Sequence, residues 1–187
     1  MGKVTTQLED KTIAFIRKQR VFFVASAPSG DGGLINLSPK GLDTFAILDP
    51  ATVAYLDLTG SGVETIAHLR QNGRIVIMFC SFDGAPNILR LWGEGDIVEP
   101  GDKEWESLRA MFPEMPGARS VIRVRISRIA DSCGYAVPFY TYAGERKTLL
   151  EWAAKKGPEG VEAYKSDNNR KSLDGLPGLR NLPPTQE

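Results

Sequence analysis

The sequence contains very few of the residues that build disulfide frameworks and metal sites. Cys80 and Cys133 are its only cysteines among 187 residues, and His68 is its only histidine. Two distant cysteines exclude a disulfide scaffold and a paired-cysteine motif, and they suit a reducing compartment. One histidine excludes a zinc site built from several imidazoles, and any Ser-His-Asp site would depend on His68. We therefore predict no metal site, and we expect His68 to be solvated on a helix.

Net charge and long apolar runs are also absent. Lysine plus arginine and aspartate plus glutamate each number 23, so the formal net charge is zero. Without a broad positive field, we expect no binding to nucleic acid or to an anionic membrane, and any anion site must be local. No uncharged apolar stretch approaches the roughly 18 to 20 residues that span a bilayer, and the N-terminus has no apolar signal-peptide core. We expect a soluble, cytoplasmic protein.

Runs rich in β-branched and aromatic residues, separated by glycine, proline and aspartate, dominate the first two thirds of the chain. They predict strands at residues 20–27, 34–41, 52–58, 74–82, 87–100 and 120–132, with a loop between 42 and 51. Helical spacing predicts a helix capped by Thr6 and further helices at residues 61–72, 101–112 and 146–156. Residues 74–82 are apolar on both faces, as in a strand of a closed or nearly closed barrel. The predicted fold class is mainly β with peripheral helices (α+β).

The last strand and the C-terminal region each carry a further prediction. In the strand at 120–132, the apolar and polar alternation changes phase at Arg128 and Ile129, which predicts a β-bulge there. We divide the chain into one domain, residues 1–156, and an extended Gly/Pro-rich tail, residues 157–187. Leucines recur at every third position from 173 to 182, which fits polyproline geometry in a groove, and a disordered end is the alternative.

The stretch DLTGSGVETIAHLRQNGRI, residues 57–75, is the strongest candidate site, because a strand runs through two glycines directly into a helix. Ser61 and Glu64 have the spacing of a capping box, and Gly73 suits a left-handed helix end. A helix N-terminus favours an anion such as phosphate, and Lys40 and nearby hydroxyl groups could bind its oxygens. The alternative is that these residues only form a cap and a turn. The stretch has neither the Walker spacing nor that of G-x-G-x-x-G, which argues against nucleoside triphosphates.

Four segments, NLSPKG, YLDLTGSG, ETIAHLRQNGRI and ILRLWGEG, follow one another in an order that resembles the pyridoxamine 5′-phosphate oxidase-like family of FMN-binding split-barrel proteins. The likeness covers roughly residues 7–132, and the YLDLTGSGxETIAHL pattern is specific to one branch of that family. The resemblance implies a six-stranded Greek-key split β-barrel. It also implies a homodimer that binds FMN at the subunit interface.

The residue positions add detail to this resemblance. It implies that residues 38–41 lie beside the flavin ring, that Lys40 binds phosphate, and that Leu58 and Thr59 contact the flavin. With the helix motif, the candidate cofactor-binding residues are Ser38, Pro39, Lys40, Gly41, Leu58, Thr59, Ser61, Gly62 and Thr65. Glu64 and Thr65 stand where the oxidase has an Arg-Lys phosphate clamp, which removes charge-assisted bonds of about 1.5–3 kcal/mol each. Arg74 or Arg90 could supply a replacement cation.

The resemblance implies an FMN-dependent oxidoreductase, in which the cofactor performs the electron or hydride transfer and no side-chain catalyst is required. Oxidation of pyridoxamine phosphate itself is not expected, because the substrate signature of that enzyme is not recognisable after residue 133. Four aromatic residues could instead line a flavin or substrate face, or pack in the core or a dimer interface: Tyr135, Phe139, Tyr140 and Tyr142. The alternatives are a non-catalytic protein that holds flavin, deazaflavin or haem, and a flavin-free interaction module.

Overall fold

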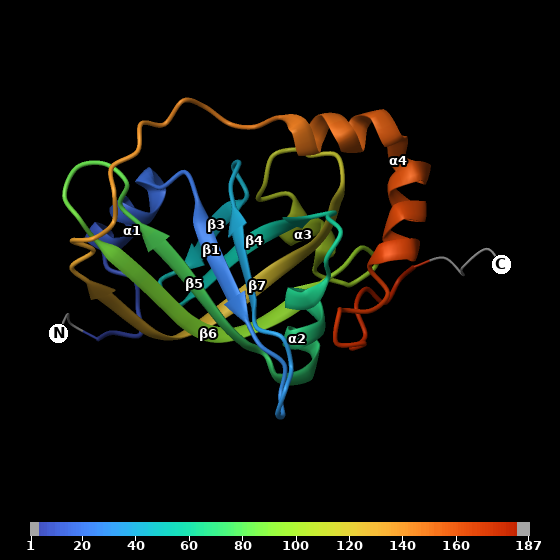
Figure 1. Ribbon diagram of the computed structural model, residues 1–187, viewed down its shortest axis with the longest axis horizontal. Coiled ribbons are helices and arrows are strands. Elements are labelled where there is room, and N and C mark those ends of the chain that lie inside the picture. The colour runs from blue at the N-terminus through green and yellow to red at the C-terminus, as the bar shows by residue number, and fades with distance from the viewer. Residues whose placement is uncertain (1–3, 183–187) are drawn as a thin grey trace.

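A computed structural model describes residues 4–182 of the protein. Its centre is one antiparallel sheet whose strand order is β2-β1-β5-β6-β7-β4-β3 (Figure 1). The strands are β1 (Phe22–Ser26), β2 (Asn36–Lys40), β3 (Phe45–Asp49), β4 (Thr52–Leu58), β5 (Arg74–Cys80), β6 (Ile88–Val98) and β7 (Ala118–Ser132). The predicted α+β class and split-barrel architecture are confirmed, with seven strands in the described part of the chain where six were expected.

The sheet curls until strands that are distant in its order face one another. The ring of Phe22 on β1 lies 5.1 Å from that of Phe45 on β3 and 5.6 Å from that of Tyr55 on β4. Three strands separate β1 from β4 in the sheet, so these contacts require a barrel-like curvature. The enclosed core also includes Val24 and Ile77, which have no exposed surface.

The seventh strand, β3, lies where the sequence predicted a loop. Its residues, FAILD, pair with β4 across the short turn at Pro50 and Ala51. These five residues show too little alternation of apolar and polar side chains to predict a strand. Pairing with β4 stabilises β3 instead. Pro39 lies on an edge strand, since β2 ends the sheet, and an edge position tolerates its missing amide.

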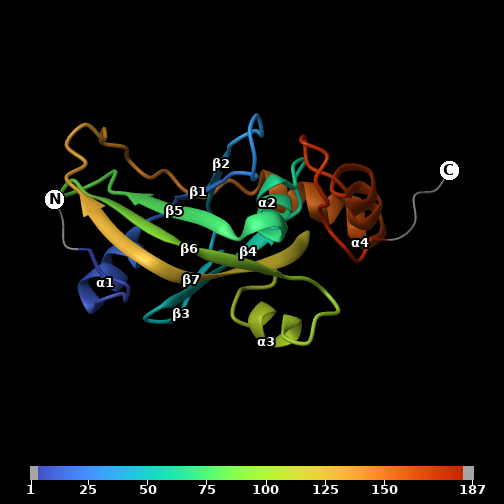
Figure 2. The same ribbon diagram turned by 90° about the horizontal axis from the view of Figure 1, so that it is seen from below.

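Four helices surround the sheet in the described part of the chain: α1 (Asp10–Lys18), α2 (Glu64–Asn72), α3 (Trp105–Arg109) and α4 (Thr148–Asn168). Figure 2 shows α3 on one side of the sheet and α2 on the other. Val63, Ile66 and Leu69 bring α2 into the main core, whereas Leu108 and Phe112 cover a second apolar cluster.

Two predicted helix caps are wrong, and one predicted helix end is right. Helix α1 begins after Glu9, because the segment with Thr6 is held in extended form by hydrogen bonds from Thr5 to Ile129 and from Leu8 to Pro50. Helix α2 begins at Glu64 with Val63 as its N-cap, and Ser61 makes no capping bond. Gly73 ends α2 in the left-handed conformation, with φ of 69°, as predicted.

Strand β7 contains two bulges. Trp92 faces Arg128 and Gly93 faces Ile126, so Ser127 has no opposite residue, and the predicted bulge is confirmed within one position. Near the start of the strand the register shifts again, where β7 pairs with the end of β4, and Arg119 is the extra residue. A bulge re-aims side chains, and this one directs Arg119 toward β4.

Residues 158–168 are helical and not extended, which corrects the predicted extended tail. Helix α4 changes direction at Gly157, with φ of 68°, and continues from Pro158. Proline is favourable in the first turn of a helix, so the Gly-Pro pair links two helical pieces. After α4, a C-terminal segment, residues 169–182, folds back through turns against α2, and residues 183–187 of the expected tail lie outside the described residues.

Candidate functional site

A cavity of about 370 Å³ lies between β2, the end of β4 and the start of α2, and we call it the β2–α2 cavity. All nine candidate residues line it: Ser38, Pro39, Lys40, Gly41, Leu58, Thr59, Ser61, Gly62 and Thr65. Further lining residues are Asn36, Leu42, Thr44, Leu56, Gly60, Glu64, Arg119 and Leu149. Sequence segments from four parts of the chain therefore meet at one place.

Side-chain hydrogen bonds connect β2 with the start of α2. Asn36 Nδ2 donates to Thr65 Oγ1 across 2.9 Å, and Ser38 Oγ donates to Asn36 Oδ1 across 3.1 Å. The hydroxyl of Thr59 is directed elsewhere, since it donates to the carbonyl of Gly117 across 2.8 Å. The fold therefore already uses the hydroxyl of Thr59, whereas Ser61 and Thr65 line the cavity, Thr65 as the acceptor of the Asn36 hydrogen bond.

A buried ion triad lies at the edge of this cavity. The carboxylate of Asp57 is 1% exposed, and it accepts a hydrogen bond from Lys40 Nζ at 2.9 Å and from Arg119 Nε at 2.7 Å. Burial alone would raise the pKa of Asp57, but the adjacent charges of Arg119 and Lys40 outweigh it and lower that pKa to about 2. Both cations are thus fixed by one ionised carboxylate.

Arg119 is the second cation that the sequence did not reveal. Its signal is weak, because it is one of several arginines near a strand and its direction depends on the β7 bulge. The two arginines proposed from the sequence lie elsewhere: Arg74 donates to the carbonyl of Pro28, and Arg90 donates to Ser132. Neither lines the cavity.

Asn169, at the end of α4, holds the far wall of the cavity. Its Oδ1 accepts from Arg119 Nη1 and its Nδ2 donates to the carbonyl of Gly60, both across 2.9 Å. The residue has no exposed surface. Asn169 therefore holds Arg119 and the loop at Gly60 in place. It does so although it lies some 40 residues beyond the part of the chain, residues 7–132, that resembles the family.

The remaining acidic group is Glu64, at the first position of α2. Its Oε1 accepts a hydrogen bond from the amide of Leu173 across 3.3 Å, which joins the C-terminal segment to α2. Glu64 and Asp57 together balance the charges of Lys40 and Arg119. An anion in the cavity would therefore depend on the amides at the start of α2 and on hydroxyl groups as well as on the two cations.

His68 is buried, which corrects the expectation that it is solvated. It has no exposed surface, its Nδ1 lies 3.0 Å from Ser26 Oγ, and its Nε2 lies 3.8 Å from Asp174 Oδ2. Burial lowers the pKa of His68, and the nearby carboxylates of Asp174 and Glu64 partly oppose this. His68 does not line the β2–α2 cavity. Its buried ring instead packs α2 against the rest of the fold.

The aromatic residues after β7 do not pack in the core of this chain. Tyr135, Phe139, Tyr140 and Tyr142 are 83%, 79%, 66% and 51% exposed. They belong to the β7–α4 linker, residues 133–147, which crosses one end of the sheet as an extended chain (Figure 1). Tyr140 and Tyr142 line a second cavity, of about 670 Å³, which we call the linker cavity.

Residues 4–182 contain neither a candidate metal site nor a candidate membrane-spanning helix. No group of three or more histidine, cysteine, aspartate or glutamate side chains in this part of the chain could hold a metal ion. No helix among the same residues combines the length and apolar character needed to cross a bilayer.

The comparisons with known proteins agree with one another. The sequence matches the profile of the pyridoxamine 5′-phosphate oxidase family over residues 8–133. It is 40% identical over 191 residues to the pyridoxamine 5′-phosphate oxidase family protein ustO of Aspergillus flavus, covering 92% of this chain and 76% of that protein. The fold is similar to that of Group A Streptococcus HupZ, with TM-score 0.53, 20% identity and coverage of 72% and 99%. It is also similar to a Clostridium acetobutylicum protein related to general stress protein 26, with TM-score 0.50, 13% identity and coverage of 66% and 86%. The chain therefore belongs to the pyridoxamine 5′-phosphate oxidase family.

Proposed function

We propose that the protein is a cytoplasmic flavoprotein that binds FMN in the β2–α2 cavity and acts as an oxidoreductase. One observation carries the proposal: all nine residues that the sequence assigned to FMN line a single cavity. The cavity volume of about 370 Å³ falls in the range of small-molecule sites, roughly 300–1,000 Å³. The buried Cys80 and exposed Cys133 are both free thiols, which agrees with a reducing compartment.

The donors in the cavity fit a phosphate group. Lys40 and Arg119 supply two cations, Ser61 and Thr65 supply hydroxyls, and the first turn of α2 supplies amides without helical acceptors. In place of the Arg-Lys clamp of the oxidase, the phosphate would meet one lysine from β2 and one arginine from β7. Because Glu64 and Asp57 offset these charges, we expect moderate FMN affinity and strong dependence on the α2 amides.

The ring of the flavin would lie along β2. Residues 38–41 form one wall, and the apolar side chains of Leu56, Leu58 and Leu149 form others. A bound flavin supplies hydride or single-electron transfer. The chain itself binds and orients the cofactor, and Lys40, held by Asp57, keeps a fixed positive charge near it.

A second copy of the chain is part of this proposal. The β1–β2 hairpin exposes three apolar side chains, Leu34, Ile35 and Leu37, which are 53%, 79% and 64% accessible. Clustered exposed apolar residues next to a ligand site are typical of an interface, and a homodimer would bury them twice by symmetry. We expect the cofactor to lie at this interface and pyridoxamine phosphate not to be a substrate.

The second candidate function is a non-catalytic flavin or deazaflavin carrier. The small number of acid-base groups favours this function. Only three residues that line the cavity have ionisable side chains: Lys40, Glu64 and Arg119. Haem is a weaker occupant, because the chain's only histidine lies outside the cavity.

Absorption spectroscopy of the purified protein distinguishes the oxidoreductase from the carrier. We expect a flavin spectrum after reconstitution with FMN, and we expect NADH or NADPH to bleach it without oxygen. A flavin spectrum that neither nucleotide bleaches would favour the carrier. A colourless protein that takes up no added FMN would contradict both and leave an interaction module.

A further inference from the structure

We propose that the linker cavity binds a small aromatic anion, such as an aryl carboxylate, beside the flavin. This inference rests on the proposed FMN site and names the class of its second ligand. The linker cavity and the β2–α2 cavity share a wall made of residues 39–42 and Leu149. Because residues 39–41 are the positions assigned to the flavin ring, a molecule in the linker cavity would lie next to that ring.

The walls of the linker cavity are aromatic and apolar. Phe82, in the β5–β6 loop, and Tyr140 stack with ring centroids 5.4 Å apart, and Tyr142, Val21 and Leu149 complete the apolar lining. Tyr140 and Tyr142 keep more than half of their surface exposed, which costs hydration free energy unless something covers them. An aromatic ring placed against these side chains would bury that surface and stack on it.

Hydrogen bonds hold the β7–α4 linker in place. Its Tyr140 amide donates to the carbonyl of Phe82 across 2.9 Å, and its Tyr142 hydroxyl donates to Glu145 Oε1 across 2.6 Å. The other oxygen of Glu145 accepts from the amide of Leu42 across 3.3 Å. The cavity wall is therefore attached both to the β5–β6 loop and to the residue that follows the flavin-ring positions.

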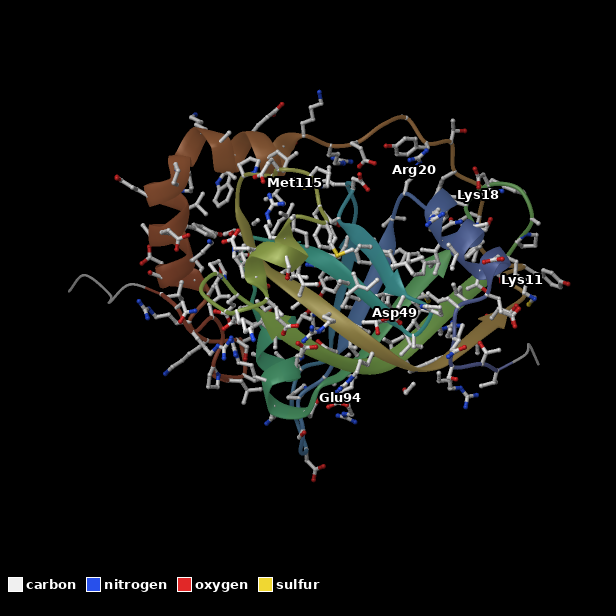
Figure 3. The ribbon with its side chains drawn as sticks, turned by 180° about the vertical axis from the view of Figure 1, so that it is seen from behind. Lys11, Lys18, Arg20, Asp49, Glu94 and Met115 are labelled. Carbon is white, nitrogen blue, oxygen red and sulfur yellow. The ribbon has the colours of Figure 1, made fainter. Side chains whose placement is uncertain are left out.

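The charges around the linker cavity select an anion. Lys18, Arg20 and Arg146 line it, and none of them forms an ion pair with another residue between 4 and 182. Arg20 lies over the Tyr142 ring at 5.3 Å, and Figure 3 shows Lys18 and Arg20 at the end of α1. The acidic lining residues are Asp83 and Glu145, and Glu145 is already occupied by the linker contacts. An aryl carboxylate would place its ring on the tyrosines and its charge among the cations.

The test uses the full chain and two fluorescent probes, 1-anilinonaphthalene-8-sulfonate and its uncharged analogue N-phenyl-1-naphthylamine. We expect the sulfonate to bind at least about tenfold more tightly than the analogue, and we expect Lys18→Ala with Arg146→Ala to remove that difference. Tyr140→Ala should weaken both probes. Tyr135→Ala is a matched control outside the cavity and should change neither. Binding that is equal for both probes, or unaffected by the cavity variants, would overturn the proposal.

A second measurement connects the cavity with the cofactor. Benzoate added to the FMN-loaded protein should shift the visible flavin spectrum, and the shift should disappear in the Lys18→Ala, Arg146→Ala variant while FMN stays bound. FMN binding without a benzoate response would refute this inference and leave the flavin site standing. If FMN fails to bind but the sulfonate probe still does, the proposed flavin function fails and the anion site survives. If Tyr140→Ala dissociates a dimer and leaves both probe affinities unchanged, a second copy occupies this face and the proposal is wrong.

Discussion

Arg119 Nε lies 2.7 Å from Asp57 Oδ2, although the two residues are 62 positions apart in the chain. The contact exists because a bulge at the start of β7 turns Arg119 toward the end of β4. This contact places a cation at the β2–α2 cavity, in a chain that lacks the Arg-Lys phosphate clamp of the oxidase. The same carboxylate also holds Lys40, so one buried acidic residue orients both positive groups.

Replacing Asp57 by asparagine should lower the free energy of unfolding by about 3–5 kcal/mol, as is typical when one partner of a buried ion pair is removed. The substitution leaves Lys40 and Arg119 close together without their shared counter-charge. Urea unfolding at neutral pH measures the loss. Asp96→Asn is the matched control, because its pair with Arg123 is only partly buried and should contribute no more than about 1 kcal/mol. Equal losses in the two variants would contradict the role assigned to the triad.

His68 should make stability depend on pH in the weakly acidic range. Burial holds the pKa of His68 in the folded chain below its ordinary value of 6.5, so the unfolded chain takes up the proton more readily. The free energy of unfolding should therefore be highest above pH 6.5 and should fall as the pH drops from there toward the folded pKa. His68→Gln should lack this slope. Because the chain has one histidine, proton NMR can follow its titration directly, and a folded pKa at or above 6.5 would refute the prediction.

Asn169→Ala should weaken FMN binding about tenfold, which corresponds to roughly 1.4 kcal/mol. The change removes the bonds that fix Arg119 and the carbonyl of Gly60. Asn168→Ala is the control, since that exposed side chain only donates to the carbonyl of Tyr164. Fluorescence titration of FMN gives both affinities. Wild-type affinity in Asn169→Ala would show that the C-terminal segment does not support the site.

Local sequence patterns predicted the elements that carry their own signals. The strands with clear alternation, the bulge near Ile129 and the end of α2 at Gly73 all follow from neighbouring residues. Strand β3 was missed because its pairing with β4 outweighs a weak local pattern. The second half of α4 was missed because Gly157 and Pro158 resemble a helix end, whereas here they join two helical pieces.

The same distinction applies to the candidate site. The residues on β2 and near α2 lie in motifs that could be recognised, and the fold brings all nine to one cavity. Arg119 and Asn169 could not be predicted in this way, because their positions depend on a bulge and on contacts across 50 to 109 positions of sequence. Ser61 was predicted as a helix cap, but the turn at Gly62 and Val63 places the helix start two residues later.

The central claim is that the start of α2 and Lys40 hold the phosphate of FMN, and paired titration with FMN and riboflavin tests it most directly. The two flavins share one ring system, and only FMN carries the phosphate. We expect wild-type protein to bind FMN at least about tenfold more tightly than riboflavin. In Lys40→Ala with Thr65→Ala, FMN binding should weaken at least tenfold, riboflavin binding should change little, and the fold should be kept. Equal affinity of the wild type for the two flavins, or unchanged FMN affinity in the variant, would contradict the account.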